Sequence, residues 1–261
     1  MNPASMLTPI AGYFALVGFT YLVFWKWGAR VFASRRIQNP GKLDRAQIGR
    51  EVRNALLTML FSSAIPLLIA GGSRVQATVE GWAPWELAAL FVVLLVLNDA
   101  WFYATHRLLH SPWLFKHVHS VHHRSIDVNP FSVYSFHPLE GILLTAWVIP
   151  VVLLFPIPLP LLGAMQFIGL LNNVNAHLGY ELMPRWFVRI PPFSWFTSST
   201  FHNQHHAQVT GNYGLMFRVW DRMLGSERVD YVQRFLTRGA QFMEGRTSAS
   251  ATCPPASRPP E

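Results

Sequence analysis

The sequence predicts an all-α integral membrane protein with about four transmembrane helices and a cytoplasmic helical cap that carries its histidines. Three observations predict this class. The chain of 261 residues is 51% hydrophobic and only 13% charged, whereas roughly a quarter of the residues in a soluble domain are charged. Its apolar residues form uncharged stretches near the ~20 residues that a membrane-spanning helix needs. Its histidines gather at helical spacings around these stretches.

Four spans are expected. The first covers residues 7–25, which carry no charge, and the second lies between the arginines at 53 and 74. The third, LAALFVVLLVLNDAWFYAT, is interrupted only by Asp99. The last uncharged tract, 141–180, is too long for one span. Because proline lacks an amide donor and clashes with the preceding turn, FPIPLP at its middle predicts the bend of a helical hairpin.

Basic residues predict the orientation of these spans, because cytoplasmic loops are enriched in Lys and Arg. The loop at 26–53 holds eight basic residues and is expected to face the cytoplasm. Residues 73–85 and the prolyl bend then face the opposite side, and residues 104–140 and 176–261 lie in the cytoplasm. The net charge of +8 is expected to reflect this topology and attraction to anionic lipid rather than binding of nucleic acid.

One domain is expected over residues 1–240, because neither the spans nor the cap could complete a histidine site alone. The Pro, Ser and Ala-rich residues 241–261 are expected to be disordered. They contain Cys253, the single cysteine of the chain, so neither a disulfide framework nor a cysteine-ligated iron–sulfur cluster is expected. No basic residue precedes the first apolar run, which predicts a retained span rather than a cleaved signal peptide.

Nine histidines recur at spacings that place side chains on one face of a helix. HRLLH holds two at i and i+4, while HSVHH and HNQHH each hold three at i, i+3 and i+4. A ninth follows Asn173 by one turn at the end of the last span. The nine are His106, His110, His119, His122, His123, His177, His202, His205 and His206.

This set predicts a metal site. A lone histidine near a helix end is usually a surface residue, but many converging imidazoles without a metal would leave buried donors and acceptors unpaired. Imidazole suits zinc, copper, iron and nickel, and a tetrahedral zinc takes no more than four ligands. Eight or nine imidazoles therefore imply two metal ions. Haem fits less well, because neighbours such as His122 and His123 cannot both serve one axial position.

The segments LNDAWFYATHRLLH, LFKHVHSVHH, FHPLEG and GNYGLMFRVWDRMLGS extend the pattern. The order HxxxH, HxxHH, a hydrophobic hairpin ending in an Asn/His pair, and a second HxxHH resembles the membrane fatty acid hydroxylase and sterol desaturase superfamily over residues 95–226. The resemblance implies a di-iron oxygenase that uses O2 and two externally supplied electrons to hydroxylate or desaturate a lipid, whether sterol-like, carotenoid or fatty-acyl. It implies that the nine histidines bind two iron ions, with no catalytic residue separate from the metal centre.

Other residues are candidates to support this centre. Some relatives place a histidine at Asn173, so this amide is a candidate for binding metal through water. Asp99 lies on a helical stripe with the first two histidines and could accept a hydrogen bond from an imidazole, or face water at the interface. His137 could orient a ligand or stabilise the following turn, and Glu140 is a weaker candidate of the same kind. His117 points away from the triplet's face and is not expected to be a ligand.

The electrons must come from another protein, because the chain has no GxGxxG fingerprint, too few cysteines for a cluster and no evident haem domain. A ferredoxin, cytochrome or reductase is expected, docked near Arg218, Arg222 and Arg228. The bacterial inner membrane is favoured over the endoplasmic reticulum. Two alternatives stay open: a non-catalytic membrane carrier of haem or metal, and a zinc-dependent membrane hydrolase, although no HExxH motif is present.

Overall fold

A computed structural model describes residues 4–38, 43–63, 65 and 74–237 of the chain. Nearly all regular structure in these ranges is helical, which confirms the predicted helical class. The elements are α1 (Ala4–Tyr21), η1 (Leu22–Trp27), η2 (Ala33–Arg35), α2 (Arg45–Ser62), β1 (Val75–Gln76), α4 (Pro84–Leu109), α5 (Pro112–Leu114), η3 (Phe115–His119), α6 (Ser120–His123), η4 (Pro130–Ser132), α7 (Pro138–Thr145), α8 (Val148–Leu154), β2 (Ile157–Pro158), α9 (Leu159–Ala176), η5 (Phe193–Trp195), α10 (Ser199–Gln208), α11 (Val219–Met223) and α12 (Tyr231–Thr237).

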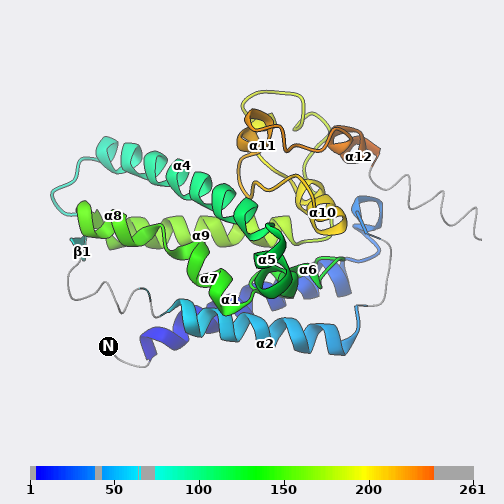
Figure 1. Ribbon diagram of the computed structural model, residues 1–261, viewed down its shortest axis with the longest axis horizontal. Helices are drawn as coiled ribbons and strands as arrows, with labels where there is room; N and C mark the ends of the chain where they lie inside the picture. Colours follow the sequence, from blue (N-terminus) through cyan, green and yellow to red (C-terminus); the bar gives the residue numbers. More distant parts are fainter. Residues whose placement is uncertain (1–3, 39–42, 64, 66–73, 238–261) are drawn as a thin grey trace, which may run out of the picture.

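The molecule has a long helical part and a cap at one end. Helices α1, α2, α4 and α9 run lengthwise, and the short helices α5, α6, α10, α11 and α12 lie toward the end opposite to the N-terminus (Figure 1). We call the segments 110–137 and 178–237 the cap. Four membrane spans and a cytoplasmic position of the cap stay predictions.

Two of the described helices are long and apolar enough to cross a membrane: Leu7–Trp27, which joins α1 to η1, and Pro84–Leu109, which is α4. They coincide with the first and third expected spans. The second expected span begins within α2, whose buried face carries polar side chains such as Glu51, and most of its remainder lies outside the described residues. The first arm of the hairpin is divided between α7 and α8, and four side-chain amides lower the hydropathy of α9.

Capping interactions mark the starts of helices α2 and α4. Asp44 caps α2, because its carboxylate accepts a hydrogen bond from the Gln47 amide at 2.6 Å. Helix α4 opens with Pro84, and the Glu86 carboxylate accepts a hydrogen bond from the Ala83 amide at 2.8 Å. From this start α4 continues for 26 residues, which brings its last turn to the histidine site.

The prolyl cluster forms the expected bend. Helix α8 ends, the two residues of β2 follow, and α9 begins directly after them. Strand β2 pairs in parallel with β1, placing Val75 opposite Ile157 and Gln76 opposite Pro158. The two loops that the charge pattern assigned to one side of the membrane therefore lie together. The strands themselves were not predicted, because a two-residue segment shows no periodicity.

Three clusters of buried hydrophobic side chains hold the helices together. One joins α1, α2 and α9, a second joins α4, α8 and α9, and a third lies in the cap around α10 and α12. Helix α9 takes part in two clusters, through Met165 in its N-terminal half and through Val174 near its C-terminal end. His177 is the residue that caps this end.

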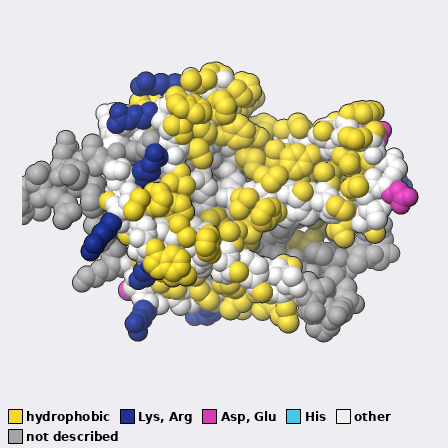
Figure 2. Space-filling view, turned by 180° about the vertical axis from the view of Figure 1, so that it is seen from behind, with side chains coloured by type: hydrophobic (Ala, Val, Ile, Leu, Met, Phe, Trp, Pro, Cys, Tyr) yellow, Lys and Arg dark blue, Asp and Glu magenta, His cyan; other side chains and the backbone are white. Residues whose placement is uncertain are grey.

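Helix η1 and the basic segment after it contact the residues that begin the second part of the cap. The indole of Trp25 donates to the Leu178 carbonyl at 2.9 Å, and Arg35 donates to the Leu182 carbonyl at 2.9 Å. Figure 2 shows the Lys and Arg side chains of this face gathered toward one end, while most of the remaining described surface is hydrophobic. The histidines and the basic loop thus occupy the same end of the molecule.

Candidate metal centre

The nine predicted histidines come together in two groups. Within each group, one nitrogen from every side chain lies within 4.8 Å of the others. All of these side chains are buried except His110, which is half-buried. The first group is His106, His110, His119, His123 and His205, and the second group is His122, His177, His202 and His206.

Each HxxHH triplet divides its side chains between the two groups. In HSVHH, the i and i+4 residues belong to the first group and His122, the i+3 residue, belongs to the second. In HNQHH, the i and i+4 residues belong to the second group and His205 belongs to the first. Neighbouring residues on a helix point about 100° apart, so the adjacent histidines of each pair face different centres. Each triplet therefore contributes two rings to one group and one ring to the other; we call this the exchange of ligands.

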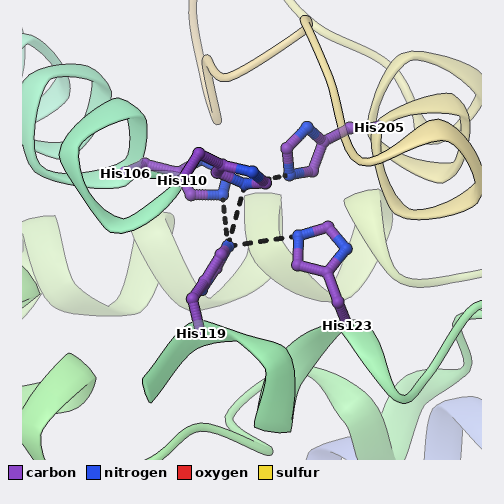
Figure 3. A group of neighbouring side chains, drawn as sticks. All are labelled: His106, His110, His119, His123 and His205. Carbon is purple, nitrogen blue, oxygen red and sulfur yellow. Dashed lines mark hydrogen bonds between the residues drawn. The ribbon is translucent and has the colours of Figure 1, made fainter. Parts of the chain in front are cut away.

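The two groups adjoin one another. The ring of His123 in the first group stacks on the ring of His206 in the second, with centroids 4.7 Å apart. Figure 3 shows the first group, whose rings converge from α4, from the η3–α6 segment and from α10. The second group takes its rings from α6, α10 and the end of α9.

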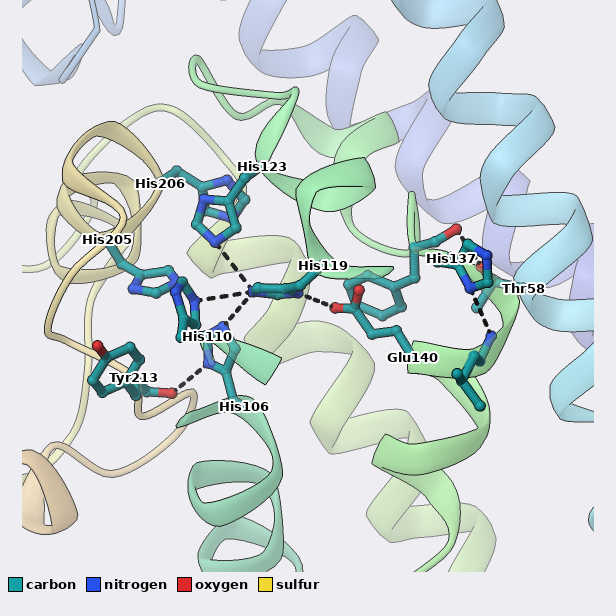
Figure 4. Close-up of polar contacts among 12 residues, drawn as sticks. Thr58, His106, His110, His119, His123, His137, Glu140, His205, His206 and Tyr213 are labelled. Atoms are coloured by element: carbon teal, nitrogen blue, oxygen red, sulfur yellow. Dashed lines mark hydrogen bonds and ion pairs between the residues drawn. The ribbon is translucent and has the colours of Figure 1, made fainter. Parts of the chain in front are cut away.

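Outward hydrogen bonds hold three rings of the first group, and Figure 4 shows those of His106 and His119. The Nδ1 atom of His106 lies 2.7 Å from the Tyr213 carbonyl oxygen, and that of His205 lies 2.7 Å from the Gly211 carbonyl oxygen. A carbonyl only accepts, so these protons are on Nδ1 and the Nε2 lone pairs face the centre. The carboxylate of Glu140 accepts from His119 Nδ1 at 2.8 Å in the same way.

This protonation pattern fits a metal ion. The Nε2 atoms of His106 and His119 lie 3.1 Å apart. Since both rings carry their proton on Nδ1, this contact is between two lone pairs and cannot be a hydrogen bond. A cation among the nitrogens would turn that repulsion into coordination, so the donor set of the first group suits a metal with five nitrogen ligands.

The second group is held by fewer outward contacts. Ser132 Oγ donates to the Asn129 carbonyl at 2.7 Å, so His177 Nδ1 donates to Ser132 Oγ at 2.8 Å. This leaves the Nε2 lone pair of His177 facing His202 Nε2 at 2.9 Å. Among the described residues, the buried Nδ1 atoms of its other three rings have no hydrogen-bond partner. Four nitrogens converge here, and they too fit a metal ion.

Burial keeps the imidazoles of the cap neutral. Desolvation, with neighbouring histidines adding to it, lowers the pKa of His123 to about 3 and that of His110 to about 2. The pKa values of His119, His122, His202, His205 and His206 are lowered well below the ordinary value by the same causes. Neutral rings keep a lone pair available, which is the state that binds metal.

Among the described residues Asp99 hydrogen-bonds to no imidazole, and its carboxylate is buried rather than facing water, so both predicted roles of this residue are wrong. Its buried carboxylate accepts hydrogen bonds from the Met216 amide at 3.0 Å, the Phe217 amide at 3.3 Å and the Trp220 indole at 2.8 Å. The segment 216–220 is nearer to Asp99 than the rings two helical turns away. Asp99 therefore fastens the cap to α4.

The remaining predicted candidates occupy three different positions. His137 caps α7, accepting from the Leu139 amide at 3.2 Å, so the reading of a structural role in the turn fits. Asn173 is buried one turn before His177. His117 is excluded from both groups, as expected, and its Nδ1 lies 2.8 Å from the Trp113 carbonyl oxygen on the exposed side.

Sequence reasoning missed the partners that hold the segment after the first triplet. The buried carboxylate of Glu51 in α2 accepts from Ser125 Oγ at 2.6 Å and from Asn129 Nδ2 at 2.9 Å. Asn129 in turn holds Ser132, the partner of His177. In the sequence Glu51 was visible only as an acidic residue, and no neighbouring motif linked it to the histidines.

The arginines proposed to dock an electron carrier are paired within the cap. Arg218 is fully buried and forms an ion pair with Glu227, so its assignment to a docking surface was wrong. Arg222 also reaches Glu227, at 3.2 Å, and Arg228 lies 3.7 Å from Asp230. The charge count of the sequence does not show these pairings.

A cavity of about 310 Å³ adjoins both groups. It lies among α2, α4, α7 and α9. Two of its lining rings contact the histidines: Phe102 lies 5.1 Å from the His106 ring and Phe136 lies 4.6 Å from the His122 ring, centroid to centroid. A molecule in this cavity would therefore have one end beside the two groups.

Comparison with known proteins places the site in a family pattern. The fatty acid hydroxylase family model matches residues 91–226, which is more than half of the chain. This range contains all nine histidines of the two groups. No solved structure matches the chain.

Two kinds of sterol enzyme are among the similar curated proteins. Methylsterol monooxygenase 1 of Gallus gallus is 34% identical over 152 residues, which cover 55% of this chain and 50% of the relative. The probable Delta(7)-sterol 5(6)-desaturase of Neurospora crassa is 30% identical over 238 residues, which cover 86% of this chain and 64% of the relative. The chain thus spans between half and two thirds of the length of these relatives.

Proposed function

The chain belongs to the fatty acid hydroxylase family, and from this premise we propose that it is a membrane-bound di-iron oxygenase. It would use O2 and two electrons from a separate protein to hydroxylate or desaturate a C–H bond of a lipid. The names of its relatives describe a sterol monooxygenase and a sterol desaturase, so an oxidoreductase acting on a lipid is the common element. The observation that carries the proposal is the exchange of ligands between two histidine triplets beside one cavity.

The nine histidines of the two groups would hold the two iron ions. Five nitrogens in one group exceed the four of a tetrahedral zinc, and neither group contains a thiolate or carboxylate ligand. Bound iron would supply the activation of O2 and the oxidation of an unactivated C–H bond. The chain's own contribution is to fix the rings: Tyr213, Gly211 and Glu140 accept the Nδ1 protons and keep the Nε2 lone pairs directed inward.

The cavity beside Phe102 and Phe136 would hold the lipid. Its lining rings Phe102 and Phe136 contact both groups, so a lipid bound there would lie beside the histidines. Sterol-like lipids are favoured over carotenoid or fatty-acyl lipids by the relatives' names. Because those names include both a monooxygenase and a desaturase, they favour neither hydroxylation nor desaturation over the other.

The topology that we propose has four spans, with the hairpin α7–α8–α9 supplying two and α2 with the residues after it supplying one. The domain would extend over residues 1–240, with the cap on the cytoplasmic side, because the basic segment packs on the cap. Asn173 would act on the second iron through a water molecule. The bacterial inner membrane stays a prediction.

A separate ferredoxin, cytochrome or reductase would supply the electrons beside Tyr213. This ring lies 5.0 Å from the ring of His110, and it lines a surface cavity of about 420 Å³ together with Arg107 and Arg228. Arg228 is paired with Asp230, so the guanidinium group of Arg107 would be the one that favours an acidic carrier. This position replaces the one built on Arg218.

The test is metal content and O2-dependent lipid oxidation on the protein purified in detergent. The double change His205→Ala, His206→Ala removes one ligand from each group, and we expect it to abolish both bound iron and product. The matched control is His117→Ala, which removes a histidine outside the groups and is expected to leave both unchanged. A single haem, or one zinc that survives the double change, would contradict the proposal and favour a carrier or a hydrolase.

A further inference from the structure

Two side-chain amides line the cavity from different helices, one half-buried and one exposed. Asn98 projects from α4 and Gln166 from α9, and both line the cavity. Within the described part of the chain, neither amide has a hydrogen-bond partner. A third polar group, the buried Oγ of Ser62, also lines the cavity without a partner among the described residues.

Unpaired amides in this place require an explanation. The surrounding helices are apolar, and an amide in hydrocarbon loses its hydrogen bonds to water without replacement. Polar side chains within membrane helices therefore usually face a cavity, water or a substrate. Both Asn98 and Gln166 face the cavity that adjoins the metal ligands.

Helix geometry places these amides at a definite depth. Asn98, Phe102 and His106 are spaced at i, i+4 and i+8, on one face of α4, so Asn98 lies about 12 Å along the axis from the histidine. Gln166 lies two turns, or about 10 Å, before Asn173 on α9. The two amides thus line the same part of the cavity, beyond the rings that contact the histidines.

We propose that Asn98 and Gln166 bind an oxygen atom of the lipid, a hydroxyl or a carbonyl, on the order of 10 Å from the carbon that is oxidised. An amide both donates and accepts, so it can pair with either oxygen. The lipid would be positioned at two points: the amides would bind its oxygen, and its reacting carbon would lie beside the histidines. This inference rests on the proposed function, because it assumes that the cavity holds the substrate.

Two glycines of α9 provide a matched pair for testing the cavity. A Cβ atom at Gly169 or at Gly163 meets no atom within 4 Å. Gly169 lines the cavity, whereas Gly163 is not among its lining residues. Gly169→Leu should therefore fill the cavity without displacing a neighbour, and Gly163→Leu should add the same bulk elsewhere on the same helix.

The experiment measures anaerobic binding of tritiated lipids to the iron-containing protein in detergent, without reductant. Two probe pairs differ only in an oxygen: 5α-cholestan-3β-ol with 5α-cholestane, and 1-octadecanol with octadecane. For the skeleton that binds, we expect the alcohol to bind about tenfold more tightly than the hydrocarbon. In the variant Asn98→Leu, Gln166→Leu we expect this preference to disappear while the hydrocarbon binds as before.

Gly169→Leu should lose binding of both members of the pair, and Gly163→Leu should keep the full preference. Equal binding of alcohol and hydrocarbon by the unaltered protein, a preference that survives the double change, or no binding of any probe would each overturn the inference. Iron content separates this failure from that of the proposed function. Protein that holds two irons but shows no preference for the alcohol refutes only the proposal that the amides bind the lipid oxygen. Protein without iron refutes the proposed oxygenase function.

Discussion

The first and second histidine groups are built from shared helices but are held differently. In the first group, three rings donate hydrogen bonds from Nδ1 to fixed acceptors. Two of these acceptors are backbone carbonyls and one is the Glu140 carboxylate. In the second group only His177 has such an acceptor, Ser132, and among the described residues the other three Nδ1 atoms have none. The first group also has five rings against four.

The difference indicates that the first group is shaped before metal binds, while the second depends more on the metal itself. Outer hydrogen bonds fix the tautomer and the orientation of a ligand ring, and their loss typically costs about 10- to 100-fold in metal affinity. Iron in the second group is therefore expected to dissociate first. Four experiments test this comparison.

The largest effect is expected from removing the exchanged ligands. His122→Ala lies in the first triplet but should empty the second group, and His205→Ala should empty the first. Each variant is expected to lose all product and to retain about one ion per chain. X-ray absorption should find more nitrogen ligands around the ion left by His122→Ala than around the one left by His205→Ala. Two retained ions in either variant would refute the exchange.

The second-largest effect is expected from Glu140→Leu. It removes the acceptor of His119 Nδ1 and is expected to weaken iron binding in the first group by about 10- to 100-fold. The measurement is the rate at which a chelator removes iron. Glu140→Gln is the matched control, since its amide oxygen can still accept the proton and should preserve most of the affinity. If Leu and Gln behaved alike, the hydrogen bond would not be what holds the ring.

Ser132→Ala tests the single outer contact of the second group. Its loss frees His177, and we expect iron in that group to bind about tenfold more weakly. Ser120→Ala is the control, because Ser120 Oγ bonds the Lys116 carbonyl on the exposed side of the same cap. Titration with a chelator should show one faster phase in Ser132→Ala only. An unchanged trace would show that the second group does not rely on this contact.

Asn173→His should have the smallest effect. It adds a ring one turn before His177 and is expected to make the two groups equal in ligand number. Iron in the second group should then dissociate a few-fold more slowly, with the first group unchanged. Faster loss of iron would mean that the new ring does not reach the second group.

The helical pattern of the sequence predicted much of this site. The spacings within HRLLH, HSVHH and HNQHH predicted helical faces, and the number of rings predicted two metal sites with four or five nitrogens each. The exclusion of His117 followed from its place outside the i, i+3, i+4 pattern. The grouping of these rings is confirmed, because it depends on spacing within one helix, which a sequence records directly. The binding of two metal ions stays a prediction.

Asp99 and Glu140 show where such reasoning ends. Both are acidic residues near histidines in the sequence pattern, and the stripe through Asp99 was the stronger signal. In the structure Glu140 contacts an imidazole and Asp99 contacts the cap segment 216–220. The choice depends on which segment packs opposite each carboxylate, and that is a long-range contact.

The sequence by itself determined the helical class, the two longest apolar helices, the bend at FPIPLP and the identity of the nine rings, because local spacing and composition carry this information. Only the tertiary structure decided how the triplets divide between two centres, which backbone carbonyls hold the rings, that Arg218 is buried against Glu227, and that two amides from separate helices line one cavity. These features arise where segments distant in the chain pack together, and carbonyl groups, which every residue carries, leave no mark in a sequence.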